Sequence, residues 1–302
     1  QEMTAVLVVS LALSMTVAVE SGRCGVVENN DDRNAMMRIV LVGGNGYIGS
    51  ALAQSLRQQS RNVFAISRTA DKDGVCLNLA NPADFDYDIL REGDCVVLTA
   101  AVSSPDVCCR ETAMARQVNV DGSAIFIRRC LERQCRVLFF SSDTVYGASN
   151  SVDPIVFVET SSRNPVGLYG AMKKEIEDMF LGKPGFCSLR LSYVVSLTDK
   201  FTSYLVSCGQ HGREAEIFHP FRRSVIGLKD VVAAVGALSD IPDTRLPSAC
   251  NLCGPQCLSR EEIAVVCREV LCPDLQWRLV RPDSGFYAAR PEKICLESLY
   301  LT

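Results

Sequence analysis

Short apolar runs alternate with helical periodicities along the middle of the chain. Runs of apolar, partly β-branched residues predict buried strands at residues 38–42, 62–67, 94–99, 136–140 and 186–191. Between them, apolar positions recur every three to four residues, which predicts helices at residues 48–60, 113–134 and 168–181. Strands that alternate with helices form right-handed βαβ units in a parallel sheet. The pattern therefore predicts an α/β fold with a doubly wound parallel sheet.

The periodicity becomes less regular beyond Tyr193. Residues 225–228 form a short apolar run, and residues 229–238 have a helical pattern. Ser259 and Glu262 have the spacing of a capping box, in which each side chain bonds the backbone N–H of the other residue, so a helix is expected to begin there. We expect this part of the chain to form a smaller C-terminal lobe that is partly interleaved with the first domain.

The composition excludes several classes of protein. Hydrophobic residues make up 48% of the 302 residues and charged residues 22%, which is typical of a globular chain and excludes a disordered one. The formal net charge of -4 gives no general basic field, so neither nucleic acid nor an anionic membrane is expected as a partner. An anionic ligand must then be bound by a few local arginines or by backbone amides.

The first 36 residues differ from the rest. Residues 4–19 are apolar, but the stretch is shorter than the roughly 20 residues of a spanning helix and lacks the basic start of a signal peptide. The folded protein is expected to begin near Met37. Residues 1–36 are then an extension that is disordered or outside the fold, and a misassigned start, a weak membrane anchor and a disordered tail all remain open.

The chain has 15 cysteines at irregular spacing. An odd number in a long chain is unlike a secreted disulfide framework, so reduced thiols in a cytoplasmic protein are expected. Cys250, Cys253 and Cys257, with Cys267 and Cys272 beyond them, raise the alternative of a zinc site. A zinc site needs a second well-spaced ligand pair or histidines, and the chain has 2 histidines, so no metal is expected.

A glycine-rich loop follows the first predicted strand. Gly43, Gly46 and Gly49 lie between that strand and a helix, which is the context of a Rossmann-type dinucleotide loop. The helix N-terminus favours a pyrophosphate there, because its amides are unpaired and its dipole is positive. Tyr47 and Ile48, in the same loop, are expected to contact the cofactor. The alternative is a structural turn without a ligand.

The end of the second strand indicates which dinucleotide is bound. An acidic residue there would bond a ribose 2′-hydroxyl and repel a 2′-phosphate. This chain has Ser67 and Arg68 instead, and arginine pairs well with phosphate. The sequence therefore favours NADP over NAD, unless Arg68 is merely a solvated surface residue.

A tyrosine and a lysine one turn apart suggest proton transfer. Tyr169 and Lys173 share one face of a predicted helix, and an ammonium close to a phenol lowers the phenol's pKa. Ser142 follows a buried strand, where a hydroxyl could orient a substrate carbonyl. Each residue alone is more often structural, but their order after a dinucleotide loop connects them.

The chain from Met37 to its C-terminus resembles the extended short-chain dehydrogenase/reductase family of NAD(P)-dependent sugar-nucleotide epimerases, dehydratases and reductases. The motifs that carry the resemblance are VGGNGYIG, DCVVLTAA, NVDGS, FFSSDTVYG, NPVGLYGAMKKEIE and ARPEKICLES. The resemblance implies that Ser142, Tyr169 and Lys173 are catalytic and that Asn119 supports the Lys173 side. It also implies that further residues contact the cofactor, namely Leu79, Ala100, Ala101 and Val194.

The resemblance also implies a substrate class. Arg223 and Arg290 match positions that bind the diphosphate of a nucleotide sugar, although two surface arginines are the alternative. Asp143 and Thr144 are expected to contact the substrate, and Thr144 replaces the glutamate common in dehydratases, which disfavours 4,6-dehydration. Asn78 and Gly227 also depart from the family pattern. The later segments look most like the reductase branch that includes dTDP-4-dehydrorhamnose reductase.

These observations predict an NADP-dependent reductase, or epimerase-reductase, of a keto-sugar nucleotide, with Tyr169 as proton donor. A nucleotide-sugar 4-epimerase and a catalytically silent NADP-binding regulatory subunit are the alternatives. The expected domains are a nicotinamide-nucleotide-binding domain at residues 37–192 and a mainly substrate-binding lobe at residues 193–302, from which residues 222–250 return to the first domain. Relatives often form homodimers through the helices matching residues 114–134 and 168–181, so a homodimer is expected.

Overall fold

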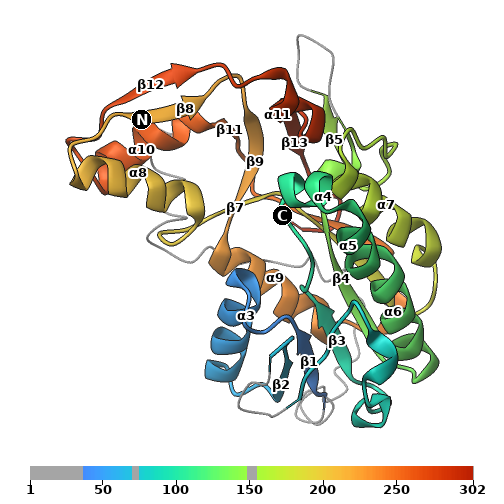
Figure 1. Cartoon of the computed structure of the whole chain (residues 1–302). Helices are drawn as coiled ribbons and strands as arrows, with labels where there is room; N and C mark the ends of the chain where they lie inside the picture. The colour runs from blue at the N-terminus through green and yellow to red at the C-terminus, as the bar shows by residue number, and fades with distance from the viewer. Residues whose placement is uncertain (1–36, 70–74, 148–154, 302) are drawn as a thin grey trace.

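A six-stranded parallel sheet forms the centre of the molecule (Figure 1). The computed structural model describes residues 37–69, 75–147 and 155–301. The strand order is β10-β6-β4-β3-β1-β2. The strands are β1 (Ile39–Val42), β2 (Val63–Ile66), β3 (Cys95–Leu98), β4 (Arg136–Ser142), β6 (Phe186–Leu191) and β10 (Ala249–Leu252). The predicted α/β class with a doubly wound parallel sheet is confirmed.

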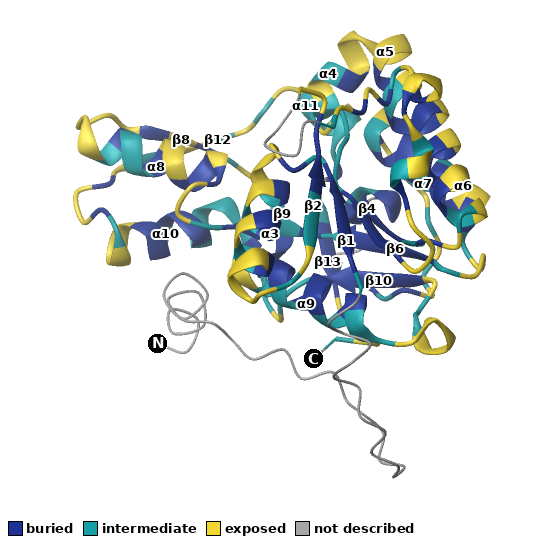
Figure 2. Cartoon of the chain, turned by 90° about the horizontal axis from the view of Figure 1, so that it is seen from below, coloured by how far each residue is buried: buried dark blue, intermediate teal, exposed yellow. Residues whose placement is uncertain are grey.

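Helices cover both faces of this sheet because side chains alternate along each strand. Ile39 and Leu41 of β1 pack in one core with α3 (Tyr47–Gln58) and α9 (Leu228–Asp240). Val40 and Val42 pack in the opposite core with α6 (Ser123–Glu132) and α7 (Leu168–Phe180). Figure 2 shows the buried central strands between these helices. Strands enclosed on both faces read as continuous apolar runs, which is how the sequence revealed them.

The helix predicted over residues 113–134 is interrupted. It consists of α5 (Thr112–Arg116), a π-helical turn over Gln117–Gly122 and α6, and the short α4 (Pro105–Arg110) precedes it. Gly122 explains part of this geometry, since a Cβ there would lie 1.6 Å from the carbonyl oxygen of Leu79. The wide turn thus brings the helix backbone against the segment that follows β2.

The smaller lobe contains short strands in two further sheets. One has the order β11-β9-β13-β5, with β7 also paired to β9, and the other joins β12 to β8. The strands are β5 (Val156–Phe157), β7 (Tyr193–Val195), β8 (Ala215–Phe218), β9 (Arg222–Gly227), β11 (Cys257–Ser259), β12 (Trp277–Val280) and β13 (Lys293–Leu296). The helices are α8 (Lys200–Gln210), α10 (Arg260–Val270) and α11 (Ser284–Ala289).

The chain passes between the two parts of the molecule several times. After β9 in the smaller sheet, α9 packs on the large sheet and β10 becomes its edge strand. The division into domains at residue 192, with residues 222–250 returning, stays a prediction. The capping box that opens α10 is confirmed, because Ser259 Oγ accepts from Glu262 N and Ser259 N donates to Glu262.

The expectation for residues 1–36 lies outside the described residues. Within the part of the chain that the structure describes, no helix has both the length and the apolar character needed to cross a membrane.

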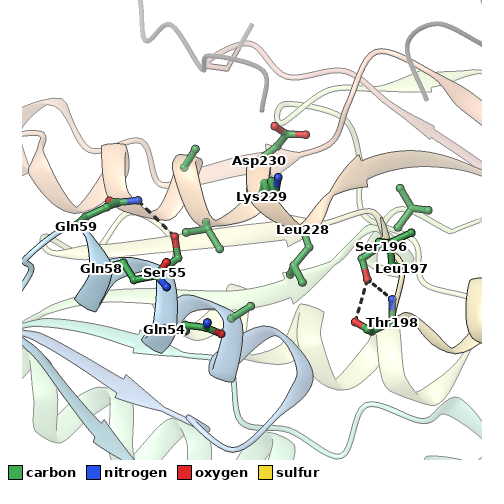
Figure 3. Close-up of a pocket in the computed structure, with 14 residues that line it drawn as sticks. Gln54, Ser55, Gln58, Gln59, Ser196, Leu197, Thr198, Leu228, Lys229 and Asp230 are labelled. Carbon is green, nitrogen blue, oxygen red and sulfur yellow. Dashed lines mark hydrogen bonds between the residues drawn. The ribbon is translucent and has the colours of Figure 1, made fainter. Parts of the chain in front are cut away.

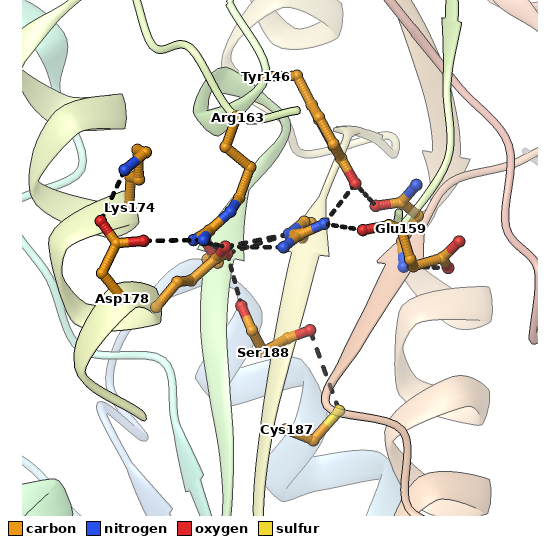
Figure 4. Close-up of polar contacts among 11 residues, drawn as sticks. Tyr146, Glu159, Arg163, Lys174, Asp178, Cys187 and Ser188 are labelled. Atoms are coloured by element: carbon orange, nitrogen blue, oxygen red, sulfur yellow. Dashed lines mark hydrogen bonds and ion pairs between the residues drawn. The ribbon is translucent and has the colours of Figure 1, made fainter. Parts of the chain in front are cut away.

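A buried network of charged groups surrounds Glu177 in the C-terminal half of α7 (Figure 4). The Glu177 carboxylate is fully buried, and it accepts hydrogen bonds from Arg190 at 2.9 Å and Arg163 at 2.9 Å. The hydroxyls of Ser141 and Ser188 donate to the same carboxylate at 2.6 and 2.7 Å. Both cations and the carboxylate are therefore fully partnered, which fixes α7 against β4 and β6.

Candidate active site

A groove of about 680 Å³ opens at the carboxyl ends of the parallel strands. Its walls include Val42 at the end of β1, Thr99 after β3 and Leu191 at the end of β6. Ligands of open α/β sheets bind at this edge. The groove brings together a large part of the predicted set, namely Gly43, Gly46, Tyr47, Ile48, Gly49, Arg68, Leu79, Ala100, Ala101, Tyr169 and Lys173.

The glycine loop leaves no room for side chains. Gly43 has a φ of +97°, and a Cβ there would lie 2.6 Å from Thr99 Oγ1. A Cβ on Gly49 would lie 2.1 Å from the carbonyl oxygen of Gly43. Helix α3 begins after Gly46 with no side-chain cap and no acidic residue in its first turn. Its free amides and positive dipole therefore face the groove as an anion site.

The end of β2 also fits a nicotinamide nucleotide. The Ser67 hydroxyl is buried without a hydrogen-bond partner among the described residues, and Arg68 beside it is exposed on the groove wall. Asn78 lies on the same wall, where its side-chain oxygen accepts from Ala80 N at 3.0 Å. A hydroxyl and a guanidinium with no side-chain partner in the described part of the chain suit a ribose and its phosphate at this position, so the residues present fit the group.

Lys173 lies deep in the groove on α7. Its side chain is 2% exposed, and Nζ donates to the carbonyl oxygen of Phe140 at 2.7 Å. The ammonium lies 4.5 Å from the Phe139 ring centroid and 5.7 Å from that of Tyr169. Burial lowers the pKa of Lys173 to about 7, although the charge of Glu177 one turn further along α7 opposes this shift.

The pKa of Tyr169 differs from the expectation that the ammonium lowers it. Burial raises this pKa well above the ordinary value of 10.0, and the nearby Cys108 and Asp143 raise it further. Desolvation of the phenolate dominates this pKa, and Lys173 Nζ, 5.7 Å from the ring centroid, does not reverse the shift. Among the described residues the Tyr169 hydroxyl makes no hydrogen bond. It is therefore protonated at neutral pH and free to donate to a ligand.

Ser142 does not lie on the groove wall as the other two predicted catalytic residues do. Its Oγ donates to Asp143 Oδ1 at 3.0 Å and accepts from Thr144 Oγ1 at 2.9 Å. The segment nevertheless packs on the Tyr169 end of α7, because a Cβ on Gly170 would lie 2.5 Å from the carbonyl oxygen of Thr144. The serine is thus next to the tyrosine's helix, with its hydroxyl engaged by its own loop.

Asn119 and Val194 lie differently from the other predicted residues. Asn119 is buried in the π-helical turn, where it accepts from Val102 N at 2.8 Å and donates to Val102 O at 3.0 Å. It therefore holds the loop after β3, and Val102 is on the groove wall. Val194 is buried in the core of the large sheet and is not one of the groove-lining residues.

Arg223 and Arg290 both lie beyond the groove in the smaller lobe. Arg223 is 6% exposed, with Nε 3.5 Å from Asp143 Oδ2. Burial lowers the pKa of Arg223 to about 10 despite that carboxylate. Arg290 pairs with Asp106 through two bonds of 2.8 and 2.6 Å. Arg290 directly follows α11, whose end meets Gly167 at the start of α7, since a Cβ on Gly167 would lie 2.3 Å from Ala289 O. Asp143 thus connects the arginine region with the serine segment.

Sequence reasoning missed part of the groove wall. Thr99, Val102, Ser103, Met114 and Val118 all line it. Thr99 ends the predicted strand at residues 94–99, and Val102 and Ser103 follow it, so their position at a carboxyl strand end was an available signal. Met114 of α5 and Val118 of the π-helical turn had no such signal, because periodicity predicted one continuous helix over residues 113–134.

The expectation of reduced thiols is wrong for one pair of cysteines. Cys257 of β11 and Cys295 of β13 form a disulfide with a Cα–Cα distance of 5.5 Å. Both strands pair with β9, so the smaller sheet brings together two residues that are 38 positions apart in sequence. Cys250, Cys267 and Cys272 are free and buried. In the described ranges, no three acidic, histidine or cysteine side chains form a metal-ligating group.

A second groove, of about 580 Å³, lies between α3, α9 and the loop after β7 (Figure 3). Ser55, Ser196 and Asp230 are among its lining residues. None of the predicted site residues lines it, although the Tyr47 hydroxyl of the first groove forms a 2.6 Å hydrogen bond with Ser196 Oγ on its wall. The two grooves share no lining residue, so the second groove is not counted as part of the candidate active site.

The parallel sheet, the glycine loop and the tyrosine–lysine pair on one helix face define a protein of the extended short-chain dehydrogenase/reductase class. Comparison with family models is more specific. The chain belongs to the family described as RmlD substrate binding domain, whose model matches residues 37–225. The class groups sugar-nucleotide reductases, epimerases and dehydratases.

Curated relatives and solved structures agree with this assignment. The dTDP-4-dehydrorhamnose reductase of Mycobacterium tuberculosis is 27% identical over 137 residues, covering 45% of this chain and 43% of that protein. The chain therefore matches less than half the length of that relative. A UDP-glucose 4-epimerase of Yersinia enterocolitica is 25% identical over 68% of this chain and 67% of its own length. The crystal structure of the Bacillus anthracis dTDP-4-dehydrorhamnose reductase in complex with NADP has a TM-score of 0.72 and 17% identity, covering 86% and 89% of the two chains.

Proposed function

We propose that this protein is an NADP-dependent oxidoreductase that reduces, or epimerises and reduces, a keto-sugar nucleotide. The observation that carries the proposal is the position of Tyr169. Its hydroxyl is protonated at neutral pH, makes no hydrogen bond within the described residues and lines the same groove as the glycine loop. Reduction of a carbonyl requires a protonated acid next to the dinucleotide groove whose hydroxyl is available to the substrate.

In the proposed reaction, different residues donate the proton, stabilise the phenolate and position the substrate. A bound nicotinamide nucleotide supplies the hydride. Tyr169 donates the proton to the developing alkoxide, and Lys173, held by Phe140 O, stabilises the phenolate that remains. Ser142 binds the keto oxygen after exchanging one of its bonds to Asp143 or Thr144. Asn119 keeps the Val102 loop in place at the groove wall.

The preference for NADP rests on the end of β2. Arg68 is exposed and the Ser67 hydroxyl has no partner within residues 37–69, 75–147 and 155–301, so both can bind a 2′-phosphate. Solved neighbours of this fold hold NAD as well as NADP. The position that reads the ribose carries no carboxylate here, which favours NADP. Gly43, Gly46 and Gly49 would hold the pyrophosphate at the start of α3, and Leu79, Ala100 and Ala101 would line the remaining wall.

The substrate class rests on Arg223 and Arg290. We infer that both bind the diphosphate of a nucleotide sugar, while Asp143 and Thr144 contact the sugar. Arg223 is a buried guanidinium, which suits a charged ligand in a dry site. One relative is a dTDP-4-dehydrorhamnose reductase, and a solved neighbour, MoeE5, is in complex with UDP-glucose and NAD.

Cofactor stoichiometry tests the proposal and separates it from its alternatives. Purified protein is incubated with dTDP-4-dehydrorhamnose or with UDP-glucose, and the consumption of NADPH and NADH is followed. A reductase consumes one NADPH for each alcohol formed. Conversion of UDP-glucose to its 4-epimer without net cofactor consumption would instead establish the epimerase that the Yersinia relative suggests. NADPH binding without turnover of any sugar nucleotide would establish a regulatory subunit. A homodimer and a cytoplasmic location stay predictions.

A further inference from the structure

Arg260, at the start of α10, has a side chain without an anionic partner. It makes no hydrogen bond and no ion pair within the described residues, and its Nε is fully enclosed without a partner. By contrast, Arg222 nearby pairs with Glu262 at 2.8 Å and also donates to Cys257 O. An enclosed guanidinium that lacks both an acid and an acceptor is costly unless something else completes it.

Aromatic rings hold this guanidinium in a defined position. Its central carbon lies 4.3 Å from the ring centroid of Phe201, 5.0 Å from that of Phe221 and 5.9 Å from that of Tyr193. Stacked rings restrict the rotamers of an arginine and leave its planar edge for hydrogen bonds in the ring plane. Arg260 is therefore pre-organised, although no described side chain uses its donors.

The same aromatic cluster carries the two arginines of the proposed diphosphate site. Arg223 lies over Phe221 at 4.3 Å, and Arg290 lies over Phe286 at 4.6 Å. The Phe221 and Phe286 rings are 5.6 Å apart. Burial is the largest cause of the lowered pKa of Arg223, and the charges of Arg260 and Arg290 lower it further. The three cations thus lie close enough to influence one another.

Few carboxylates are available to balance these three charges. Asp106 pairs with Arg290, and Asp143 lies 3.5 Å from Arg223. Asp199 is the acid that acts on Arg260 electrostatically, but its oxygens accept from the Tyr193 hydroxyl at 2.7 Å and from the backbone amides of residues 196, 201 and 202. Arg260 is the cation of the three that no carboxylate contacts directly.

We propose that Arg260 is a third arginine that binds the substrate diphosphate, alongside Arg223 and Arg290. This inference rests on the proposed function, since it assigns a further residue to the same substrate site. The ligand it fits is a nucleoside diphosphate, whose two phosphates carry charge that three guanidiniums can share. Because the diphosphate is remote from the reacting carbon, Arg260 contributes to binding rather than to the chemical step.

Binding of nucleoside diphosphates by calorimetry tests the inference. Arg260→Gln and Arg260→Lys are compared with wild type for UDP and dTDP. Arg268→Gln is the matched control, because Arg268 lies on the same helix and over an aromatic ring, Trp277 at 4.5 Å, but is exposed. We expect the Gln variant to weaken binding at least tenfold, the Lys variant to weaken it less, and the control to leave it unchanged. Thermal unfolding of each variant shows that the comparison is made on folded protein.

The outcomes separate this inference from the proposed function. If wild type binds a nucleoside diphosphate and both Arg260 variants bind it equally well, Arg260 only packs against the rings and the inference is wrong while the proposed function stands. If wild type binds NADPH but no nucleoside diphosphate, the proposed substrate class itself fails. With turnover, the Gln variant should raise KM and leave kcat within about twofold. A fall in kcat at unchanged KM would contradict a binding role.

Discussion

Two buried regions of this molecule differ in whether their polar and charged side chains have hydrogen-bonding partners. In the C-terminal half of α7, the Glu177 carboxylate binds Arg190 and Arg163 and also accepts hydrogen bonds from serine hydroxyls (Figure 4). In the groove and the smaller lobe, the Tyr169 hydroxyl and the Arg260 side chain lack partners among the described residues, and Ser67 Oγ is enclosed without one. Both regions are built from the same residue types.

The difference teaches how to separate structural charge from functional charge. A fully partnered buried cluster is complete without a ligand, and its removal is felt as a loss of stability. A region with unpartnered buried groups is incomplete as it stands, and a ligand that supplies the missing partners gains binding energy there. Helix α7 joins the two, with Tyr169 and Lys173 toward the groove and Glu177 in the network.

The largest expected effect is the loss of turnover when Tyr169 is replaced. Tyr169→Phe removes the proton donor and should lower turnover by about 10²–10⁴-fold while NADPH binding persists, since general acid catalysis contributes this much. Steady-state kinetics and cofactor titration measure the two quantities. Tyr300→Phe, at an exposed tyrosine, is the control. Full turnover in Tyr169→Phe would remove the tyrosine from the mechanism.

A matched pair of substitutions examines the comparison directly. Glu177→Gln leaves Arg190 buried without an anion and should lower the free energy of unfolding by about 3–5 kcal/mol. Arg260→Gln removes a cation that contacts aromatic rings but pairs with no carboxylate among the described residues, and it should change the free energy of unfolding by less than about 1 kcal/mol. Urea denaturation of both variants gives the two values. Equal losses of unfolding free energy would show that the two regions contribute to stability in the same way.

The buried lysine predicts a pH dependence of stability. In the folded chain the pKa of Lys173 is about 7, against an ordinary 10.5. Between these values the unfolded chain binds a proton that the folded chain releases, so the contribution of Lys173 to the free energy of unfolding rises with pH and is lowest below about pH 7. Lys173→Met should therefore be stabilised relative to wild type by a few kcal/mol below neutrality, and the difference should vanish toward pH 10.5. A difference that is independent of pH would mean that the amine is not desolvated.

The smallest expected effect concerns the choice of cofactor. Arg68→Ala should weaken NADPH binding by about tenfold and leave NADH binding nearly unchanged, because a charge-assisted contact to one phosphate is lost. Fluorescence titration with both cofactors gives the ratio. Arg57→Ala, on α3 and away from the groove wall, is the control. Equal losses for both cofactors would assign Arg68 to a general role.

The sequence predicted the elements of the large parallel sheet better than the strand pairings and side-chain contacts of the smaller lobe. Strands such as β1 are enclosed on both faces, so they appear as apolar runs, and Gly43 and Gly49 mark a loop that admits no side chain. The pairing of Cys257 with Cys295 depends on the way β9, β11 and β13 come together, which periodicity does not reveal. The Tyr169 pKa was expected to fall because only the neighbouring lysine was visible, whereas burial dominates. Arg260 was missed because its aromatic neighbours come from separate elements.

The central claim is that a hydride passes between a nicotinamide in the groove and a carbon of a nucleotide sugar. Its most direct test uses NADPH that carries deuterium at the transferable position, with a keto-sugar nucleotide as acceptor and mass spectrometry of the sugar product. The account predicts one deuterium on the carbon that becomes the alcohol, and labelled product formed about 10²–10⁴-fold more slowly with Tyr169→Phe. An alcohol formed without deuterium, or label that stays entirely in the cofactor while the sugar is converted, would contradict it.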